Sequence, residues 1–230
     1  MSKLQWDQSG EKKYESGADQ GVLFPIGDDG AYKAGIAWSG LRVVSESPDG
    51  AEETALWADN IKYASLLSTE NFKGSIGAYT SPKEFDAMDG TADLGGSDLG
   101  VTVGQQERRP FGFSYRTLIG SDTVSLGADY KIHLVYGAKV SPSSREHNSV
   151  NDTPAAVELS WDFTTTPIPV PGLKPSAHLV IDSTKTDKDA LAKIEALIYG
   201  ADGTTSTTSK LPTPQEIIDI IKPTVEGGGQ

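Results

Sequence analysis

The side chains that could carry catalytic or metal chemistry are few, and their spacing does not favour it. His133, His147 and His178 form no H-x-x-x-H pattern, and the chain has no cysteine that could complete a metal-binding set. His133 is expected on the polar face of a strand, where it is solvated or hydrogen-bonded. The sequence therefore predicts no metal site, no thiol chemistry and no cofactor.

Other signatures of enzymes are incomplete. The glycine-rich stretch Gly95–Gly100 lacks the lysine of a phosphate-binding loop and is expected to be a turn. No G-x-S-x-G nucleophile motif occurs. The acidic pairs Asp28-Asp29 and Glu52-Glu53 fall in expected loops, without an apolar pocket that would raise a carboxyl pKa. Asp182–Asp187 lacks the glycine and glutamate of a calcium loop. The chain is therefore expected not to be an enzyme.

The composition indicates one core and an acidic surface. At 230 residues, with 37% hydrophobic and 23% charged residues, the chain is long enough for one buried core with or without a small appendage. No apolar run of about 18 residues predicts a membrane helix, and the first residues lack the apolar stretch of a signal peptide. The net charge of −12 disfavours nucleic-acid binding, which depends on Lys and Arg.

Alternating apolar and polar residues predict a chain rich in β-strands up to about residue 182. One face of each strand is expected to contact a core, and the other is expected to be more polar. The alternation in Ile36–Val43 changes phase at Ser39-Gly40, which suggests a bulge. The clearest strands are Phe111–Ile119, Ile132–Val140 and Val157–Phe163.

Helical patterns are concentrated near the end of the chain. Thr186 is expected to be the N-cap of a helix that carries apolar residues from Leu191 to Ile198 and stops at Gly200. A shorter helix is expected over Pro214–Lys222, with its proline in the first turn. Pro82–Met88 is expected to form one or two further helical turns.

Together these patterns predict a mainly β fold, which is a β-sandwich or partly closed barrel with an α-helix packed on one side. We expect residues 1–200 to form the main domain, with an N-terminal arm and a long inter-strand loop. Residues 201–230 are expected to be a linker and a C-terminal tail that contains a short helix.

The segment Glu46–Asp59 is the strongest candidate for contact with a partner. It is expected to be a loop between two strands that carries five acidic residues and no Lys or Arg. Trp57 in this loop either packs against its own core or anchors an interface, where Trp is enriched. Arg108-Arg109, an adjacent basic pair, is expected to contact another subunit rather than DNA. The loop candidates are Glu46, Pro48, Asp49, Glu52, Glu53, Leu56, Trp57 and Asp59.

Most of the chain is covered by short motifs of strand and turn residues in a distinctive order. The longest is Leu56–Phe85, LWADNIKYASLLSTENFKGSIGAYTSPKEF. The others are Tyr14–Gly17, Gly21–Pro25, Ala37–Leu41, Glu46–Glu52, Gly104–Phe113, Tyr115–Asp122, Tyr136-Gly137, Asn148–Pro154, Trp161–Pro167, Gly172–Pro175 and Ile181–Lys185. In this order and spacing they resemble the major tail tube proteins of long-tailed, non-contractile (siphovirus-type) bacteriophages, and the resemblance fades after Gly200.

The resemblance implies a structural virion protein of the viral tail, made late in infection and assembled in the host cytoplasm. It implies that six copies form a ring, that their sheets join edge to edge into a continuous inner β-barrel, and that the rings stack into a tube. It further implies that the loop Glu46–Asp59 reaches the adjacent ring. The implied partners are copies of the chain itself, the tape measure protein, the tail tip or baseplate and tail terminator proteins, and DNA that passes without specific binding during ejection. No membrane partner is implied.

A tube that conducts DNA must not hold it, so we expect its inner wall to be net negative. The polar faces expected to line the wall belong to Ile36–Val44, Asn71–Tyr79 and Ile132–Val140. These strands also carry or adjoin basic residues. The negative charge must then come from loop acids at the strand ends, or the basic residues must be paired with acids or point to subunit contacts. The basic residues are Arg42, Lys73, Lys131 and Lys139.

Two other classes of protein fit the same strand pattern. The first is a monomeric β-sandwich module that binds carbohydrate through Trp38, Trp57 or Tyr79 as platforms. The second is a β-rich hydrolase that uses one of the acidic pairs. A sizing column separates the first class from a tube protein, because a module stays monomeric at every concentration. Loss of turnover on a single Asp or Glu change would identify the hydrolase.

Overall fold

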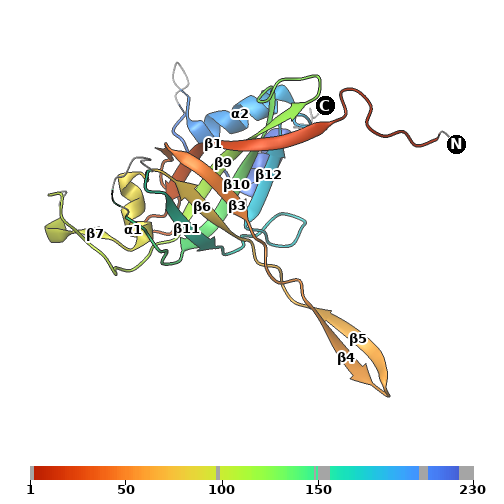
Figure 1. Ribbon diagram of the computed structural model, residues 1–230, viewed down its shortest axis with the longest axis horizontal. Helices are drawn as coiled ribbons and strands as arrows, with labels where there is room; N and C mark the ends of the chain where they lie inside the picture. The colour runs from red at the N-terminus through yellow and green to blue at the C-terminus, as the bar shows by residue number, and fades with distance from the viewer. Residues whose placement is uncertain (1–2, 97–98, 148, 150–155, 202–206, 223–230) are drawn as a thin grey trace, which may run out of the picture.

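The computed structural model describes residues 3–96, 99–147, 149, 156–201 and 207–222. Within them, twelve strands form one eight-stranded sheet and two two-stranded hairpins, and helices follow near the C-terminus (Figure 1). The expected mainly β fold is confirmed. The motif Asn148–Pro154 and the start of the expected linker after residue 201 lie largely outside the described residues.

The large sheet is built around one long antiparallel pair, β9 and β10, and β12 shares one side of β10 with β11. Its strands are ordered β2, β1, β9, β10, β11, β6, β3. Their bounds are β1 Lys13–Pro25, β2 Ile36–Trp38, β3 Leu41–Glu46, β6 Lys73–Ala78, β9 Phe111–Ser121, β10 Asp129–Val140, β11 Leu159–Thr164 and β12 His178–Asp182.

β10 passes from one half of the sheet to the other at a bulge around Gly137. Its pairing with β9 shifts register between Val135 and Ala138, and Gly137 has a φ of +57°. A Cβ at Gly137 would lie 2.8 Å from the carbonyl oxygen of Thr166. Both the positive φ and this close approach favour glycine. The bulge reverses the alternation of β10, which the sequence pattern does not show.

Two hydrophobic cores lie on opposite faces of the central strands. In β10, Ile132, Leu134 and Tyr136 belong to the core beneath the C-terminal helices, whereas Val135 belongs to the other core. The expected division of these strands into one core face and one polar face is therefore wrong. The physical reason is that the C-terminal helices cover the apolar face of β10, whereas the other core covers the face of Val135 that the pattern leaves for solvent.

The larger core is aromatic. The ring of Trp38 lies 4.6 Å from that of Phe85 and 5.6 Å from that of Trp161, the latter edge to face. Trp38 also donates a hydrogen bond from Nε1 to the Thr80 carbonyl at 2.8 Å. Phe85 is held by the helical turns η1 (Lys83–Phe85) and α1 (Asp86–Asp89), which confirms the helix expected near residues 82–88.

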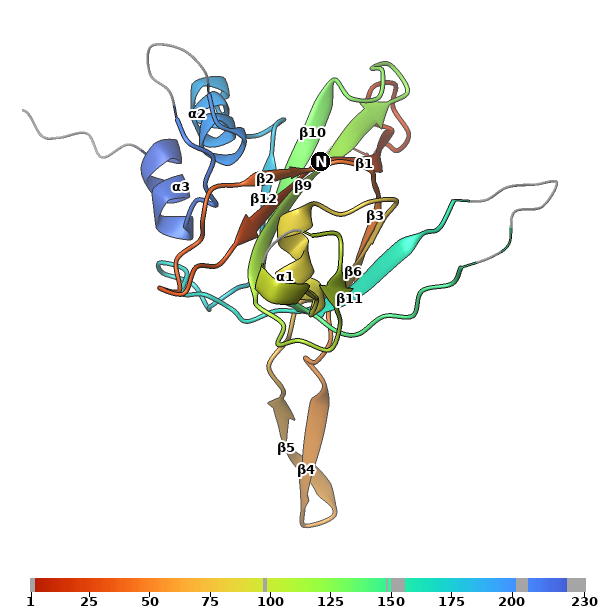
Figure 2. The same cartoon turned by 90° about the vertical axis from the view of Figure 1, so that its left-hand side faces the viewer.

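The second core lies under α2 (Lys188–Tyr199) and α3 (Pro214–Ile221), which pack together beside the sheet (Figure 2). Ile194 and Ile198 of α2 are fully buried there, and Ile217 of α3 joins them. Both helices were expected from the sequence. Among the described residues, no helix combines the length and the hydrophobicity that a membrane crossing requires.

The caps of these helices differ from expectation at one position. The N-cap of α2 is Asp187, whose side chain accepts hydrogen bonds from the two N–H groups at positions 189 and 190, and not Thr186. The Thr186 hydroxyl instead donates to the carbonyl of Asp182. Gly200 follows the last turn of α2 with a φ of +81°, as expected. α3 begins with a capping box in which Thr213 is the N-cap.

The chain turns sharply between β2 and β3. Ser39 and Gly40 form a tight turn there, with a φ of +79° at Gly40. β2 pairs with β1, whereas β3 pairs with β6, so the two strands belong to opposite ends of the sheet. The expected single bulged strand is therefore two strands, and the phase change marks the exchange of partners.

Three segments extend from this body in different directions (Figure 1). The N-terminal segment, residues 3–12, leads into β1. One hairpin consists of β4 (Glu53–Ala58) and β5 (Ile61–Leu67), and the other of β7 (Ala92–Asp93) and β8 (Thr102–Val103), with the turn η2 (Leu94–Gly96) after β7. Most side chains of these three extensions are exposed.

Candidate functional site

The most prominent candidate surface is the segment between β3 and β6, residues 47–72, which we call the β4–β5 arm. It leaves the body as a continuation of the β3–β6 pair. The N–H of Ser47 donates to the Lys73 carbonyl at 2.8 Å, and Asp49 and Asn71 exchange two hydrogen bonds of 2.9 and 2.7 Å. Farther out, the Ser68 N–H donates to the Glu52 carbonyl at 3.0 Å. The arm is therefore a ribbon hydrogen-bonded from its base into the hairpin.

The arm corrects the expectation of an open loop at Glu46–Asp59. Residues 53–58 form β4, and the turn at the tip consists of Asp59 and Asn60, with φ values of +50° and +63°. Two positive φ values are the signature of the tight turn that joins twisted strands, and Asp and Asn tolerate them. The Asp-Asn pair followed by Ile61 was the available sequence signal for this hairpin.

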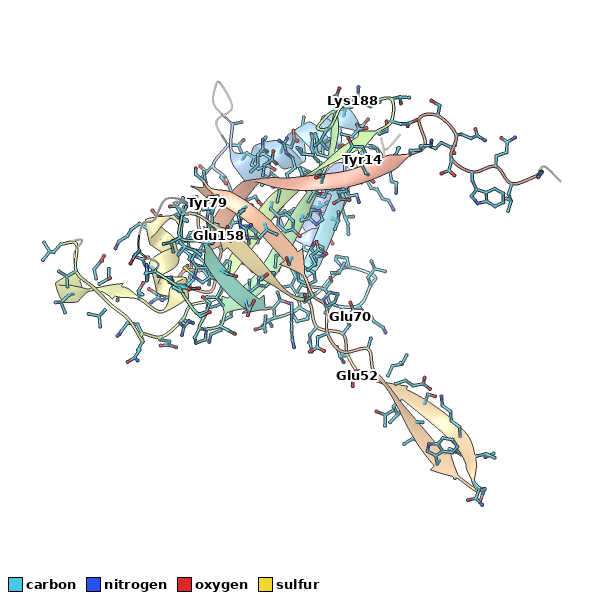
Figure 3. All side chains as sticks on the ribbon, in the orientation of Figure 1. Tyr14, Glu52, Glu70, Tyr79, Glu158 and Lys188 are labelled. Atoms are coloured by element: carbon cyan, nitrogen blue, oxygen red, sulfur yellow. The ribbon has the colours of Figure 1, made fainter. Side chains whose placement is uncertain are left out.

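The candidate residues are distributed along the whole arm. Glu46 lies on β3 at the point where the arm begins, and Asp59 lies at the tip. Figure 3 shows Glu52 and Glu70 on the two chains of the connection between body and hairpin. The remaining candidates follow in chain order: Pro48, Asp49 and Glu52 in the base, then Glu53, Leu56 and Trp57 in β4.

Two carboxylates of the arm are held by lysines. Asp49 pairs with Lys73 of β6, and this hydrogen bond lowers the pKa of Asp49 below its usual value. Glu53 pairs with Lys62 across the hairpin, and hydrogen bonds from Lys62 and Ser65 likewise lower its pKa. These pairs are exposed, so they orient the strands more than they stabilise them.

Large apolar side chains of the arm face solvent. Trp57 is 70% exposed, Tyr63 74% and Leu67 74%, and Ile61 and Leu66 are also exposed. A two-stranded hairpin on its own is at best marginally stable in water, and exposed apolar surface of this kind marks a site of interaction. The interpretation that Trp57 packs into its own core is therefore wrong, and its side chain is available to a partner.

The other two extensions share this character. The β7–β8 hairpin is closed at its base by hydrogen bonds from the Gln106 N–H to the Gly90 carbonyl and from the Arg109 N–H to the Ala87 carbonyl. Its exposed apolar residues are Leu94, Leu99, Val101 and Val103. The N-terminal segment exposes Leu4 and Trp6, at 72% and 73%.

The two candidate arginines lie at the base of the β7–β8 hairpin. Arg109 donates a hydrogen bond from Nη1 to Asp28 at 2.7 Å, within the same chain. Arg108 is partly buried, with its side chain close to Gly90. The structure places both residues beside an extension, and a subunit contact through them stays a prediction.

Basic residues on the strands expected to line a tube are largely paired. Arg42 of β3 forms an ion pair with Glu158 at 2.7 Å. Lys131 of β10 pairs with Glu15 of β1, and Lys73 pairs with Asp49 as described above. Four basic groups on these strands oppose a net negative inner wall. Three of them are thus neutralised by neighbouring acids.

The proposed carbohydrate platforms do not form one surface. Trp38 is 3% exposed and belongs to the core, so it cannot stack on a sugar. Trp57 lies near the tip of the arm, whereas Tyr79 lies on the body (Figure 3). The structure thus separates the aromatic residues that such a module would use together.

Sequence reasoning missed a polar cluster inside the body. His133 and His178 lie beside Glu46, although they come from three different strands and are far apart in the chain. His133 is 6% exposed and hydrogen-bonded to Thr117, so of the two expected states, solvated or hydrogen-bonded, the structure shows the second. Spacing within the sequence carries no signal for such a site, because the sheet topology alone brings the residues together.

No protein-family model and no curated protein matches the chain. Among solved structures, the chain is similar to the tail tube of SPP1, determined by solid-state NMR and cryo EM. The match has 12% sequence identity and a TM-score of 0.30, and it covers 85% of this chain and 96% of that chain. A TM-score this low does not establish a shared fold.

Proposed function

We propose that this chain is a structural subunit of a bacteriophage tail tube, which assembles with copies of itself. The observation that carries the proposal is the β4–β5 arm, a ribbon that extends from the body and exposes Trp57, Tyr63 and Leu67. The ordered motifs of the sequence support the same class of protein. Since the arm buries little of its apolar surface within the chain, its natural complement is another subunit.

In this proposal six copies form a ring, and the arm of each copy contacts the adjacent ring. The end strands of the large sheet, β2 and β3, leave backbone groups that pairing between neighbouring subunits satisfies. Ring closure removes such edges, and it joins the sheets into an inner barrel. The N-terminal segment and the β7–β8 hairpin supply further contacts between copies.

The tube would enclose the tape measure protein during assembly and conduct DNA into the host. It would end on tail tip or baseplate proteins and on a tail terminator, as part of the virion. The ion pairs of Arg42, Lys73 and Lys131 neutralise three of the four basic groups, so a net negative wall depends on acids in the loops at the strand ends. Assembled tubes should therefore bind DNA no better at about 50 mM than at about 200 mM salt.

The arm can be removed without disturbing the body. Asp49 and Asn71 exchange two hydrogen bonds, so replacing residues 50–70 by Asn-Gly closes a two-residue hairpin at that pair. Deletion of Pro48–Leu56 alone would instead leave β5 without its partner strand. We expect the shortened chain to fold, with an unchanged unfolding temperature of the body, and not to stack into tubes.

The measurement is negative-stain electron microscopy with a sizing column, over a range of concentrations and with tail initiation proteins added. The full chain should form six-fold rings that stack into tubes, and the shortened chain should form no tubes. Compact monomers of the full chain under every condition would argue against the tail tube proposal. Normal tubes from the shortened chain would refute the role of the arm.

A further inference from the structure

The buried cluster of Glu46, His133 and His178 has the composition of a metal site. Glu46 is the last residue of β3, His133 lies in the middle of β10, and His178 is the first residue of β12. The side chain of His133 is 7% exposed, that of His178 16% and that of Glu46 38%. Two imidazoles and one carboxylate are ligands that Zn²⁺ takes in proteins.

The three candidate ligand atoms already lie at coordination spacing. His133 Nδ1 is 3.1 Å from His178 Nε2 and 3.3 Å from Glu46 Oε1, and His178 Nε2 is 3.9 Å from Glu46 Oε1. Ligands about 2.0–2.1 Å from a tetrahedral ion stand roughly 3.3–3.4 Å apart. Small side-chain adjustments therefore suffice to surround an ion, without movement of the strands.

Hydrogen bonds behind the cluster orient His133. The Thr117 hydroxyl donates to Glu15 at 2.5 Å, so its oxygen is left to accept from His133 Nε2, which lies 3.1 Å away. This arrangement puts the ring proton on Nε2 and leaves the lone pair of Nδ1 facing Glu46 and His178. In metal sites, the ring nitrogen of a histidine that does not bind the metal usually donates its hydrogen to a second protein group.

The other two ligands are also held in place. Tyr115 donates a hydrogen bond to Glu46 Oε1 at 2.6 Å, and its ring stacks on His133 at a centroid distance of 4.5 Å. His178 stacks on Phe72 at 4.3 Å. Burial lowers the pKa of both imidazoles, which favours the neutral form that binds metal.

A pocket of about 350 Å³ opens next to the cluster and provides room for a further ligand. Glu46, His133, Thr117 and Tyr115 line it, together with Glu15. The pocket is large enough for a water molecule on the ion, beside the three protein ligands.

We propose that Glu46, His133 and His178 form a Zn²⁺ site that ties β3, where the β4–β5 arm begins, to β10 and β12 of the body. The site is independent of any tail tube function, since all three ligands belong to one chain. Its consequence for assembly, a more rigid arm base, does rest on the proposed function.

The test uses the full chain after dialysis against a chelator. Calorimetric titration with Zn²⁺ should show one equivalent per chain, and Co²⁺ should give the visible absorption of a tetrahedral site. At a Zn²⁺ concentration of about 100 times Kd, the unfolding temperature should rise by roughly 5–10 °C. The binding stoichiometry per chain does not depend on whether tubes form, because all three ligands belong to one chain.

Two ligand variants and one matched control decide the assignment. Glu46→Gln keeps the size of the side chain and an oxygen for Tyr115 but removes the anionic ligand. His178→Gln removes one nitrogen, and His147→Gln removes an exposed histidine outside the cluster. Both ligand variants should bind Zn²⁺ at least about tenfold more weakly and lose the Co²⁺ bands. The control should match the original chain.

Three results would overturn the proposal. The first is the absence of one-equivalent Zn²⁺ binding by the original chain. The second is equal affinity and equal thermal shift for Glu46→Gln, which is the variant least prone to misfold. The third is loss of binding in the His147→Gln control. Binding of Cu²⁺ without Zn²⁺ would overturn the assignment of the metal.

Discussion

Replacing Trp57 with alanine tests the β4–β5 arm without shortening it. A tryptophan side chain buries up to about 250 Å² in an interface, and Trp57 is 70% exposed in the subunit. About 175 Å² is thus available to a neighbour, which at about 25 cal/mol/Å² corresponds to at most ~4 kcal/mol per contact. Truncation of such anchors costs about 2 kcal/mol or more. The concentration needed for assembly should therefore rise roughly 30- to 700-fold.

The assay is sedimentation of tubes over a concentration series, with thermal unfolding of the monomer in parallel. The unfolding temperature should change by no more than about 2 °C, because exposed substitutions cost about 0.5 kcal/mol or less. Leu173→Ala is the matched control, since Leu173 is 77% exposed in a turn outside the three extensions. Assembly of Trp57→Ala at the original concentration, or an equal defect in Leu173→Ala, would show that the arm is not the contact.

Three further changes have defined outcomes. Gly50→Ala should impair assembly, because Gly50 has a φ of +97° and a Cβ there would lie 2.3 Å from a backbone oxygen; Gly172→Ala, with a φ of +73° and open space, is its control in the same sedimentation assay. Tyr136→Phe removes a buried hydrogen bond of 2.8 Å to the Pro212 carbonyl and should lower the free energy of unfolding in urea by about 1–3 kcal/mol. Burial acts to raise the pKa of Glu216, but hydrogen bonds from its lysine partner and the helix cap outweigh it and lower the pKa below 4.5. The carboxylate therefore stabilises the fold above pH 4.5 and loses this effect as the pH falls through its folded pKa. In a profile of stability against pH measured by urea unfolding, Glu216→Gln should make the acid side flatter.

Local patterns in the sequence predicted the positions of strands and helices in the chain better than they predicted what packs against each of them. Period-two alternation located β9, β10 and β11, and the helical spacing with Gly200 located α2. These signals are local, since they depend on side chains within a few residues of one another. The choice of Thr186 over Asp187 as N-cap is wrong, because the Thr186 hydroxyl donates to the carbonyl of Asp182 and Asp187 accepts the N–H groups of the first turn instead.

The sequence did not predict the features that depend on contacts between distant segments of the chain. Nothing in Ile132–Val140 shows that a second core covers its other face at Val135, or that Gly137 reverses its phase. The arm was expected as a polar loop because its acids dominate Glu46–Asp59, whereas its apolar residues lie mostly beyond, in Ile61–Leu67. If the returning strand is considered together with Glu46–Asp59, the sequence predicts a hairpin with an exposed apolar surface instead of a loop.

The buried cluster and the arm meet at one place in the fold, and this explains how the arm keeps its direction. Glu46 accepts a hydrogen bond from Tyr115 where the outgoing chain leaves β3. Phe72 stacks on His178 where the returning chain enters β6. Both chains of the ribbon are therefore fixed to β9 and β12 at its base, although its exposed apolar side chains lie toward the other end. A rigid base matters because a hinge there would cost conformational entropy at each contact between copies.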